Sequence, residues 1–469
     1  MSGEPLSAAP LKIVVAGASG FVGSALLDHI LTHTPHQVVG LTRRARPDAE
    51  SSERLRWVSC DLFSRLELEG ALEGADVAVY LVHSMLPSAS LTQGSFMDFD
   101  LMLADNFARA AKKNGVRQIV YLSGIIPPDS LLSPHLKSRL EVETTFRASG
   151  IPTTCFRAGL IIGPSGSSFE IMRRLVERLP MMLCPSWTAT VSCPVSVWDV
   201  VALIAASFDC AQTFDKTYDV VGPDALSYRE MMQRLAKLEG VSRRFVGVPF
   251  VSPSISRLWV CTVTGAPKDL VYPLIDSLKT NMVAYGNAPI DFSDWRPLSF
   301  EDAIKMSLGP GKGTKPYAFS YTGRSSQVRS VRSVQRMVTL FRSPVETVAD
   351  IYFGWLKSFL SWFFEVDIVP RSRVSIRLKG LKAPLLVFDY SKDRSTEGRV
   401  LYYISSGILA RPNKKGRLEF RDIYGGLYKI IAIHEYEPRL PWLLYKFSQA
   451  WVHLLVMRAF NRYLLRAKV

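Results

Sequence analysis

The alternation of apolar and polar residues divides the chain into two regions with different predicted elements. Over residues 1–310, short apolar runs of strand length alternate with longer segments of helical periodicity, including a clear amphipathic helix over 96–114. Strands are predicted at Ile13–Ala16, Gln37–Leu41, Leu55–Cys60, Ala75–Val82, Arg117–Gly124, Ile151–Arg157 and Tyr218–Gly222. Strands that alternate so regularly with helices indicate an α/β fold with a doubly wound parallel sheet covered on both faces.

From about residue 161 the alternation becomes less regular. Helices predicted over 168–179, 227–239 and 267–285 indicate a small α-rich region that covers a substrate. The stretch 309–316 is rich in Gly, Pro and Lys, a composition typical of a linker. We therefore expect a first domain over residues 1–310 and a second over 311–469.

The second region has the period of an antiparallel sheet. Apolar and polar residues alternate at Val374–Leu378, Leu385–Tyr390, Arg399–Ser405, Leu418–Ile423 and Tyr428–Tyr436. Two helices, Val345–Phe364 and Trp442–Leu465, are predicted to flank these strands. The pattern favours an α+β domain in which a curved sheet grips a long helix. Such a domain has either a cavity or a solid core, and both alternatives stay open.

Charge separates the same two regions. The chain of 469 residues has a net charge of +15, but residues 315–469 hold 27 Lys and Arg against 11 Asp and Glu. The first 314 residues are close to neutral. A basic C-terminal third indicates an anionic partner. Peripheral association with an anionic membrane is one candidate, but a helix buried on a sheet has the same aromatic and basic composition. No nucleic-acid-binding motif is recognisable, so nucleic acid is not expected as a partner.

The sequence also predicts a compartment. The N-terminus lacks the basic start and apolar core of a signal peptide, and no run of eighteen residues is predominantly apolar. The six cysteines are scattered without metal-ligand spacing. We expect buried thiols, no metal site and a cytoplasmic protein, with the inner face of the membrane as the place of any peripheral association.

Three glycines at three-residue spacing follow the first predicted strand. In this position Gly17 allows a sharp turn, Gly20 lets backbone N–H groups approach a diphosphate, and Gly23 lets the next helix pack closely on the sheet. The pattern therefore predicts a dinucleotide-binding turn. A glycine-rich turn without a ligand is the alternative, because such a pattern is weak by itself.

Polar residues at the ends of later strands extend this prediction. Arg43 and Arg44 stand where an NAD-selective site carries a carboxylate, so they suit a ribose 2′-phosphate; a solvated basic turn is the alternative. Asp61 is suited to an adenine amino group or to capping a helix, and Leu62 can cover the ring. His83 and Ser84 follow a central strand and are expected near the ligand crevice, although a lone His more often has a structural role.

Five segments carry a resemblance to a known superfamily. They are Gly17–Gly23, Tyr80–Met85, Ile119–Gly124, His135–Arg139 and Phe156–Pro164. Over residues 11–310 the chain resembles the atypical, NmrA-like and extended branch of the short-chain dehydrogenases/reductases. Over the whole length it resembles a bacterial group that joins such a Rossmann domain to a C-terminal polyketide-cyclase-like, START-like domain.

The resemblance implies a set of cofactor-binding residues. It places NADP(H) on Gly17, Ser19, Gly20, Phe21, Val22 and Gly23, with Arg43 and Arg44 near the 2′-phosphate. It also places Asp61 and Leu62 at the adenine, and Leu81, Val82, His83 and Ser84 near the riboses.

The resemblance also implies a catalytic set, with one departure. Catalytic members use a Ser or Thr, a Tyr, and a Lys four residues after the Tyr. Ser123 and Lys137 match the serine and the lysine, and the tyrosine position falls on Ser133. A serine hydroxyl is too weak an acid to replace the phenol directly. Lys137 is therefore expected to donate a proton, to bind the ribose, or both, and a lysine on the surface of a helix is the alternative.

Two function classes follow. The first is an NADPH-dependent oxidoreductase that acts on a hydrophobic carbonyl or ene substrate, with Lys137 and Ser123 at the substrate oxygen. The second is a non-catalytic NADPH sensor or scaffold whose basic C-terminal domain binds an apolar ligand, a partner or a membrane surface. The missing tyrosine favours the second class, and whether turnover occurs is left open. The oligomeric state is not predicted.

Overall fold

The computed structural model describes residues 9–43, 51–84, 91–128, 132–248, 253–278, 280–287, 295–309, 330–338, 343–359, 361–411, 413–424 and 426–466. Within it the chain forms two compact units. The first consists of Met1–Leu86 with Leu103–Ser320, and the second of Pro87–Met102 with Tyr321–Val469. The second unit thus takes in residues 87–102, a segment that the domain prediction assigns to the first. Residues 310–329, which contain the predicted boundary and most of the linker, lie outside the described part of the chain.

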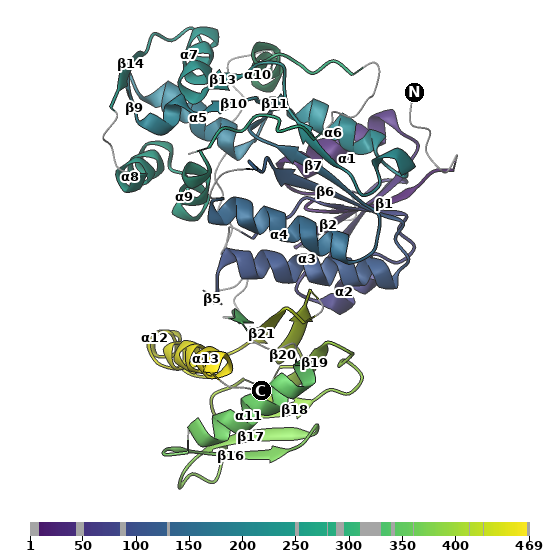
Figure 1. The fold of residues 1–469 in the computed structure, drawn as a ribbon, viewed down its shortest axis with the longest axis vertical. Helices are drawn as coiled ribbons and strands as arrows, with labels where there is room; N and C mark the ends of the chain where they lie inside the picture. The colour runs from purple at the N-terminus through teal and green to yellow at the C-terminus, as the bar shows by residue number, and fades with distance from the viewer. Residues whose placement is uncertain are drawn as a thin grey trace. The chain divides into compact units, whose positions relative to one another are not determined.

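The first unit is built on a seven-stranded sheet with the order β12-β7-β6-β4-β1-β2-β3, in which every described pairing is parallel (Figure 1). The strands are β1 (Lys12–Ala16), β2 (Gln37–Thr42), β3 (Leu55–Ser59), β4 (Val77–Tyr80), β6 (Gln118–Gly124), β7 (Thr153–Ala158) and β12 (Thr217–Val220). All seven predicted strands are present, and the predicted doubly wound Rossmann-type fold is confirmed.

Both faces of this sheet are covered because successive residues of β1 point to opposite sides. Ile13 and Val15 pack with α1 (Phe21–His33) and α6 (Val197–Ala206). Val14 and Ala16 pack on the other face with α2 (Arg65–Ala71), α3 (Phe96–Lys113) and α4 (Pro134–Ala148). Both sets are fully buried, so the apolar runs of the sequence form two cores.

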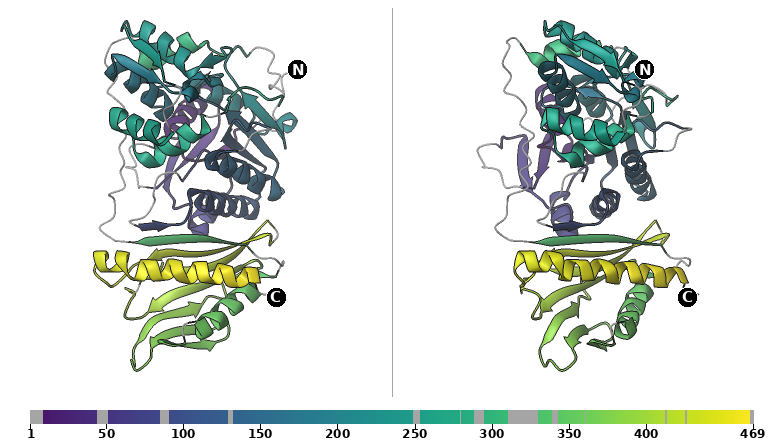
Figure 2. Two further views of the ribbon diagram at one scale, coloured as in Figure 1. Left: turned by 60° about the vertical axis from the view of Figure 1, so that its left-hand side comes forward. Right: turned by 90° about the vertical axis from the view of Figure 1, so that its left-hand side faces the viewer.

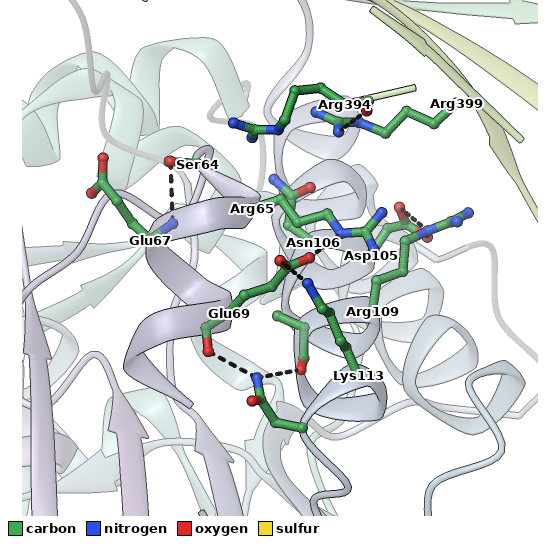
Figure 3. Close-up of polar contacts among 12 residues, drawn as sticks. Ser64, Arg65, Glu67, Glu69, Asp105, Asn106, Arg109, Lys113, Arg394 and Arg399 are labelled. Atoms are coloured by element: carbon green, nitrogen blue, oxygen red, sulfur yellow. Dashed lines mark hydrogen bonds and ion pairs between the residues drawn. The ribbon is translucent and has the colours of Figure 1, made fainter. Parts of the chain in front are cut away.

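Ion pairs attach α2 to the C-terminal half of α3. Ser64 caps α2 by accepting from the Glu67 N–H, and the Glu69 carboxylate accepts from Arg65 Nε at 2.8 Å and from Lys113 Nζ at 2.7 Å (Figure 3). Burial raises the pKa of Glu69, but the bonds from Lys113 and Arg65 outweigh it and hold that pKa below its usual value. These contacts fix the helix that follows Asp61.

Further helices and short strands make up the rest of the first unit and pack around a core of their own. They are β8 (Ile161–Ile162), α5 (Ser167–Arg178), β9 (Met181–Cys184), β10 (Val191–Ser192), β11 (Val195–Ser196), β13 (Leu226–Ser227), α7 (Tyr228–Leu238), β14 (Arg244–Gly247), α8 (Pro253–Thr264), α9 (Lys268–Ser277) and α10 (Phe300–Leu308). The α-rich region expected after residue 161 is therefore present, although α8 and α10 were not predicted.

The second unit is an α+β fold, as predicted. Its eight-stranded sheet has the order β16-β17-β18-β19-β20-β21-β15-β5. Figure 2 shows the C-terminal helix, in yellow, running along this sheet. The elements are β5 (Leu91–Gln93), β15 (Val331–Val338), α11 (Val345–Phe359), β16 (Phe364–Val369), β17 (Arg373–Leu378), β18 (Pro384–Tyr390), β19 (Arg399–Ser406), β20 (Arg417–Ile423), β21 (Tyr428–Tyr436), α12 (Trp442–Phe447) and α13 (Gln449–Arg466). The five predicted strands are confirmed as β17 to β21.

Three features of this unit differ from the predictions. The first predicted helix ends at Phe359, because Phe364 already pairs with Leu378 in the sheet. The second is interrupted at Ser448, whose φ of −125° and ψ of −85° are not helical. The sheet also gains β15, β16 and the three-residue β5, which pairs in parallel with β15.

One apolar core holds the second unit together. Tyr352 and Phe353 of α11 and Phe460 of α13 pack with sheet residues such as Phe420. The rings of Tyr352 and Phe460 meet edge to face with centroids 5.0 Å apart. Both helices therefore lie on the same face of the sheet.

Candidate functional site

The turn after β1 has the backbone geometry that a bound diphosphate requires. Gly17 has φ +87°, and a Cβ there would lie 3.1 Å from the Leu81 carbonyl oxygen. Ser19 and Gly20 are exposed, and Gly20 caps α1 while its N–H donates to the Gly17 oxygen at 2.9 Å. The positive end of a thirteen-residue helix therefore opens beside exposed backbone, an arrangement that suits an anion.

Gly23 fixes the shape of this turn. A Cβ on Gly23 would come within 2.1 Å of the Gly17 oxygen and 2.8 Å of the Ala18 Cα, a distance that real side chains do not tolerate. Because Gly23 has no side chain, the first turn of α1 can pack directly on the backbone of Gly17 and Ala18. Backbone and helix thus form a cradle in which added Cβ atoms would collide, and the residues present fit a dinucleotide diphosphate.

The second, third and fourth strands end around this cradle. Arg43 follows β2 and is exposed, whereas Arg44 lies outside the described residues. Asp61 and Leu62 follow β3 and are half-buried. The Asp61 carboxylate accepts from the Phe63 N–H at 3.1 Å, and the Leu62 carbonyl accepts from Asn106 Nδ2 at 2.9 Å. Asp61 thus begins a tight turn before α2.

The segment after β4 lies next to the glycine turn. The Leu81 N–H donates to the Ala16 oxygen at 3.0 Å, which places the start of Leu81–Ser84 beside the end of β1. Leu81, Val82 and Ser84 are half-buried, and His83 is exposed. The predicted cofactor residues with described positions therefore follow the carboxyl ends of adjacent parallel strands, where ligands of open α/β sheets bind.

Ser123 is a buried residue with an unsatisfied hydroxyl. It lies near the end of β6, is 6% exposed, and its Oγ has no hydrogen-bond partner among the described residues. Such a group is costly to bury unless something else supplies the missing bond. Its neighbours Gly124 and Ile125 line a cavity, whereas Ser123 does not.

That cavity has a volume of about 140 Å³ and lies in the first unit. Gly124 and Ala158, at the carboxyl ends of β6 and β7, form one wall, and apolar residues of α5, α7, α8 and α9 close the others. The polar groups in its lining include His135, Trp187, Tyr228 and Ser277. The cavity therefore suits a compact apolar ligand with a few polar atoms.

His135, Ser133 and Ser277 form a polar cluster at this cavity. His135 Nδ1 lies 3.2 Å from Ser277 Oγ, and Ser133 Oγ lies 2.9 Å from the same atom. Burial, with smaller contributions from Arg139 and His83, lowers the pKa of His135 to about 3. The imidazole is therefore neutral at pH 7, and the cavity carries no positive charge from it.

The catalytic role of Lys137 stays a prediction, and the structure shows only where the residue lies. Its side chain is exposed on α4 and does not line the cavity, whereas His135 and Leu136 do. Ser133, at the tyrosine position of the predicted register, caps α4 by accepting from the Leu136 N–H at 3.2 Å. The rotation of α4 is the physical reason: with 3.6 residues per turn, the face that buries Leu136, Arg139, Val142 and Phe146 leaves Lys137 outside.

Sequence reasoning missed His135, Arg139 and Ser277. Arg139 is 6% exposed, and its Nη1 donates to the Val82 oxygen at 3.4 Å, beside the segment predicted to contact the riboses. His135 and Arg139 have the same spacing of four residues as Ser133 and Lys137. The helical periodicity of apolar residues in α4 was the available signal, because it places Arg139 on the buried face and Lys137 opposite.

The sequence also led to predictions about the cysteines, metal ligands and membrane-spanning segments. Five of the six cysteines are buried, none is in a disulfide, and burial raises the pKa of Cys60 to about 12. Among the described residues there is no group of His, Cys, Asp and Glu side chains able to hold a metal ion. No helix in that part of the chain combines the length and the apolar character needed to cross a membrane.

The parallel sheet and the glycine turn define the first unit as a Rossmann-type fold. A profile of the NAD dependent epimerase/dehydratase family matches residues 13–181. These residues cover β1 to α5 and contain the cradle, Arg43, Asp61 and α4.

Two solved structures have the same fold as the first unit. One is the NADPH-dependent quinone oxidoreductase QOR2 of Escherichia coli in complex with NADPH, with a TM-score of 0.51 and 18% identity over 63% of this chain and 98% of that one. The other is a triphenylmethane reductase of Citrobacter sp., with a TM-score of 0.50 and 19% identity over 63% of this chain and 99% of that one. At these identities the likeness extends to the fold alone.

Two curated proteins match shorter parts of the sequence. The auxiliary protein GraX of Staphylococcus aureus is 29% identical over 113 residues, or 24% of this chain and 36% of that protein. UDP-D-apiose/UDP-D-xylose synthase 1 of Arabidopsis thaliana is 32% identical over 96 residues, or 19% of this chain and 24% of that protein. The chain therefore spans about a third of the first relative and a quarter of the second.

Proposed function

We propose that the first unit is an NADPH-dependent reductase of a compact apolar carbonyl, quinone or ene substrate. One observation carries the proposal: the glycine cradle after β1 and the cavity at the ends of β6 and β7 lie at the same edge of one parallel sheet. A dinucleotide on the cradle can therefore extend toward a substrate in the cavity. The two structural neighbours, an NADPH-dependent quinone oxidoreductase and a triphenylmethane reductase, support this class.

The proposed cofactor contacts follow the strand ends. The cradle of Gly17, Ser19, Gly20, Phe21, Val22 and Gly23 would hold the diphosphate. Arg43, exposed after β2, would pair with the 2′-phosphate and select NADPH over NADH. Asp61 and Leu62 would contact the adenine, and Leu81 to Ser84 the riboses. When bound, NADPH supplies a hydride to the substrate.

We assign the substrate oxygen to the side of the cavity that His135 lines. In the tautomer with the proton on Nε2, Nδ1 accepts from Ser277 Oγ and Nε2–H can donate to a substrate oxygen. When Nε2–H passes to the reduced oxygen, Nδ1 would take the Ser277 proton, and Ser277 would take one from Ser133, which solvent reprotonates. In this proposal His135 replaces Lys137 as the residue that faces the substrate, and Arg139 takes the position four residues later.

The cavity limits the substrate in size. A cavity of about 150 Å³ lined by apolar side chains holds a benzene-sized molecule, and this one has a volume of about 140 Å³. We therefore expect a ring of that size with one or two oxygens, such as a benzoquinone or an aromatic aldehyde, rather than a sugar nucleotide.

The test is NADPH oxidation by the purified full chain with a panel of benzoquinones, aromatic aldehydes and UDP-sugars. Turnover of a quinone or aldehyde that is lost in His135→Phe supports the proposal. Turnover of UDP-sugars alone would contradict the substrate class. Tight NADPH binding without oxidation by any of them would favour a sensor or scaffold.

A second candidate function concerns the C-terminal unit, which we propose binds an apolar ligand of its own. The supporting observation is a cavity of about 170 Å³ between the sheet and helices α11 and α13. Its lining is mainly apolar, and its polar groups include Gln93, Ser333, Gln449 and His453. The resemblance to START-like domains agrees with this reading. Mass spectrometry of apolar molecules that copurify with wild type but not with Ile404→Trp, which fills the cavity, tests it.

A further inference from the structure

Helices α12 and α13 each expose large apolar side chains to solvent. Its members are large apolar side chains that are at least half exposed: Leu443 (71%), Leu444 (55%), Phe447 (71%), Trp451 (56%), Val452 (52%) and Leu455 (58%). Phe447, Trp451 and Leu455 are spaced four residues apart. We call these six residues the apolar surface of α12–α13.

The opposite side of the same helices is already used by the core. Tyr445, Ala450, Met457 and Phe460 are buried against the sheet and α11. A helix that only covers a sheet needs one apolar stripe, with polar residues on its outer side. Helices α12 and α13 have apolar residues on the side that packs on the core and also on the side that faces solvent. The exposed apolar side is therefore available to a binding partner.

The charges around this surface have one sign. Residues 438–469 contain six Lys and Arg and no Asp or Glu. Arg439 and Lys446 are exposed at the beginning of this segment, and Arg458, Arg462 and Arg466 are exposed along α13. A second copy of this chain is disfavoured as the occupant, because a two-fold contact through this surface would bring the same cations together.

We propose that α12–α13 lies on an anionic lipid surface, with Leu443, Phe447, Trp451 and Leu455 in the interface and the exposed Arg and Lys at the headgroups. Aromatic and leucine side chains beside cations are the composition of helices that lie in the plane of a membrane interface. Anionic headgroups would supply the negative charges that pair with the Lys and Arg side chains of residues 438–469, because this segment has no Asp or Glu of its own.

The position of α13 gives this contact a consequence for the C-terminal cavity. Gln449, His453 and Val456 of α13 line that cavity, and Val452 both lines it and is 52% exposed. The helix that contacts lipid is therefore also a wall of the cavity. An apolar molecule dissolved in the bilayer would be presented at this wall.

Cosedimentation of the full chain with vesicles tests the proposal. The two preparations are phosphatidylcholine alone and phosphatidylcholine with 30% phosphatidylglycerol, each at about 0.1 M and about 1 M salt. The Debye length falls from about 10 Å to about 3 Å between these concentrations. We expect binding to the anionic vesicles at low salt, much weaker binding at high salt, and little binding to phosphatidylcholine.

Two variants locate the contact. Trp451→Ser with Leu455→Ser, and Arg458→Glu with Arg462→Glu, are each expected to lower partitioning at least about tenfold. Leu66→Ser removes a leucine that is 51% exposed on α2, and Lys379→Glu with Lys382→Glu reverses exposed charges elsewhere in the second unit. These two matched controls should bind like wild type. All positions are exposed, and unchanged circular dichroism and melting temperature check the fold.

Three results would overturn the proposal. They are equal binding to neutral and anionic vesicles, binding that survives both α13 variants, and no binding to either preparation. A concentration-dependent dimer that Trp451→Ser abolishes would assign the surface to a second copy instead. NADPH oxidation is measured in parallel, so a failed reductase proposal and a failed membrane proposal are distinguished.

Discussion

His135 Nδ1 lies 3.2 Å from Ser277 Oγ, which joins the first turn of α4 to the last turn of α9 at the cavity of the first unit. The Pro273 carbonyl, 3.0 Å from Ser277 Oγ, is the alternative acceptor for the single Ser277 proton when Nδ1 carries the imidazole proton. The relationship orients an uncharged imidazole toward an otherwise largely apolar space, and the first prediction rests on it.

Replacing the imidazole should separate chemistry from cofactor binding. In His135→Phe we expect kcat/KM for the reduced substrate to fall about 100-fold, because a hydrogen bond to the reacting oxygen is lost, while the Kd for NADPH stays unchanged. Lys137→Ala is the matched control on the same helix. Its exposed side chain predicts wild-type rates. Stopped-flow NADPH oxidation and calorimetry measure both quantities, and a large loss in Lys137→Ala would restore the lysine as the proton donor.

The glycine cradle predicts a steric loss of nucleotide binding. In Gly23→Ala the new Cβ would meet the Gly17 oxygen at 2.1 Å, so the turn must open and we expect NADPH affinity to fall at least about tenfold. Gly70→Ala is the control, because a Cβ there meets nothing within 4 Å and Gly70 is exposed in α2. That change should raise helix stability by up to about 1 kcal/mol. Equal calorimetric affinity of the two variants would argue against a nucleotide on this turn.

Cofactor selection should depend on Arg43. Loss of a guanidinium beside a phosphate weakens binding of the phosphorylated nucleotide only, so Arg43→Ala should raise the Kd for NADPH by about tenfold or more and leave that for NADH unchanged. Arg43→Lys, which keeps the charge without the planar fork, should lie between. Parallel titrations with both nucleotides give the ratio. If the two Kd values change together, the 2′-phosphate lies elsewhere.

Stability should fall on acidification because His453, which is partly buried, is uncharged in the folded protein. Burial lowers its pKa to about 4, against about 6.5 in an unfolded chain. Between these values the unfolded state binds the proton and the folded state does not, so stability is lost as the pH falls from 7 toward 4. The full effect is up to roughly 3 kcal/mol.

His453→Gln isolates this contribution. The amide can replace the contact between His453 Nε2 and Ser333 Oγ, which are 3.0 Å apart, but it does not titrate. The melting temperature of the full chain should therefore drop less between pH 7 and pH 5 in the variant than in wild type. An identical drop in both proteins would show that other groups, such as His135, control the acid sensitivity.

Much of the local structure was predictable from the sequence. The strands of the parallel sheet are apolar runs bounded by turn residues, because this sheet is buried on both faces. In β17 to β21 apolar and polar residues alternate, because one face of that sheet packs on the core. The glycine turn was also predictable, since few backbones other than a tight strand-to-helix turn need three glycines at that spacing. The basic character of the C-terminal third follows from the number of Lys and Arg residues against Asp and Glu.

Other features depend on contacts between distant residues. β5 has only three residues and pairs with Val331–Ser333, some 240 positions away, so no local period reveals it. The break at Ser448 and the exposure of Trp451 depend on how far the sheet extends under α12 and α13. The periodicity of the sequence predicts neither the cavity in each unit nor its volume.

The candidate active site shows where this division lies. The sequence by itself determined that a serine, a histidine, a lysine and an arginine occupy positions 133, 135, 137 and 139, and that two pairs among them share a spacing of four. Only the tertiary structure decided that His135 lines the cavity and that Lys137 is exposed, because the rotation of α4 about its axis is set by packing Leu136, Val142 and Phe146 against neighbouring elements. Each residue of a helix turns by 100°, so packing and not sequence spacing decides which side chain reaches the cavity.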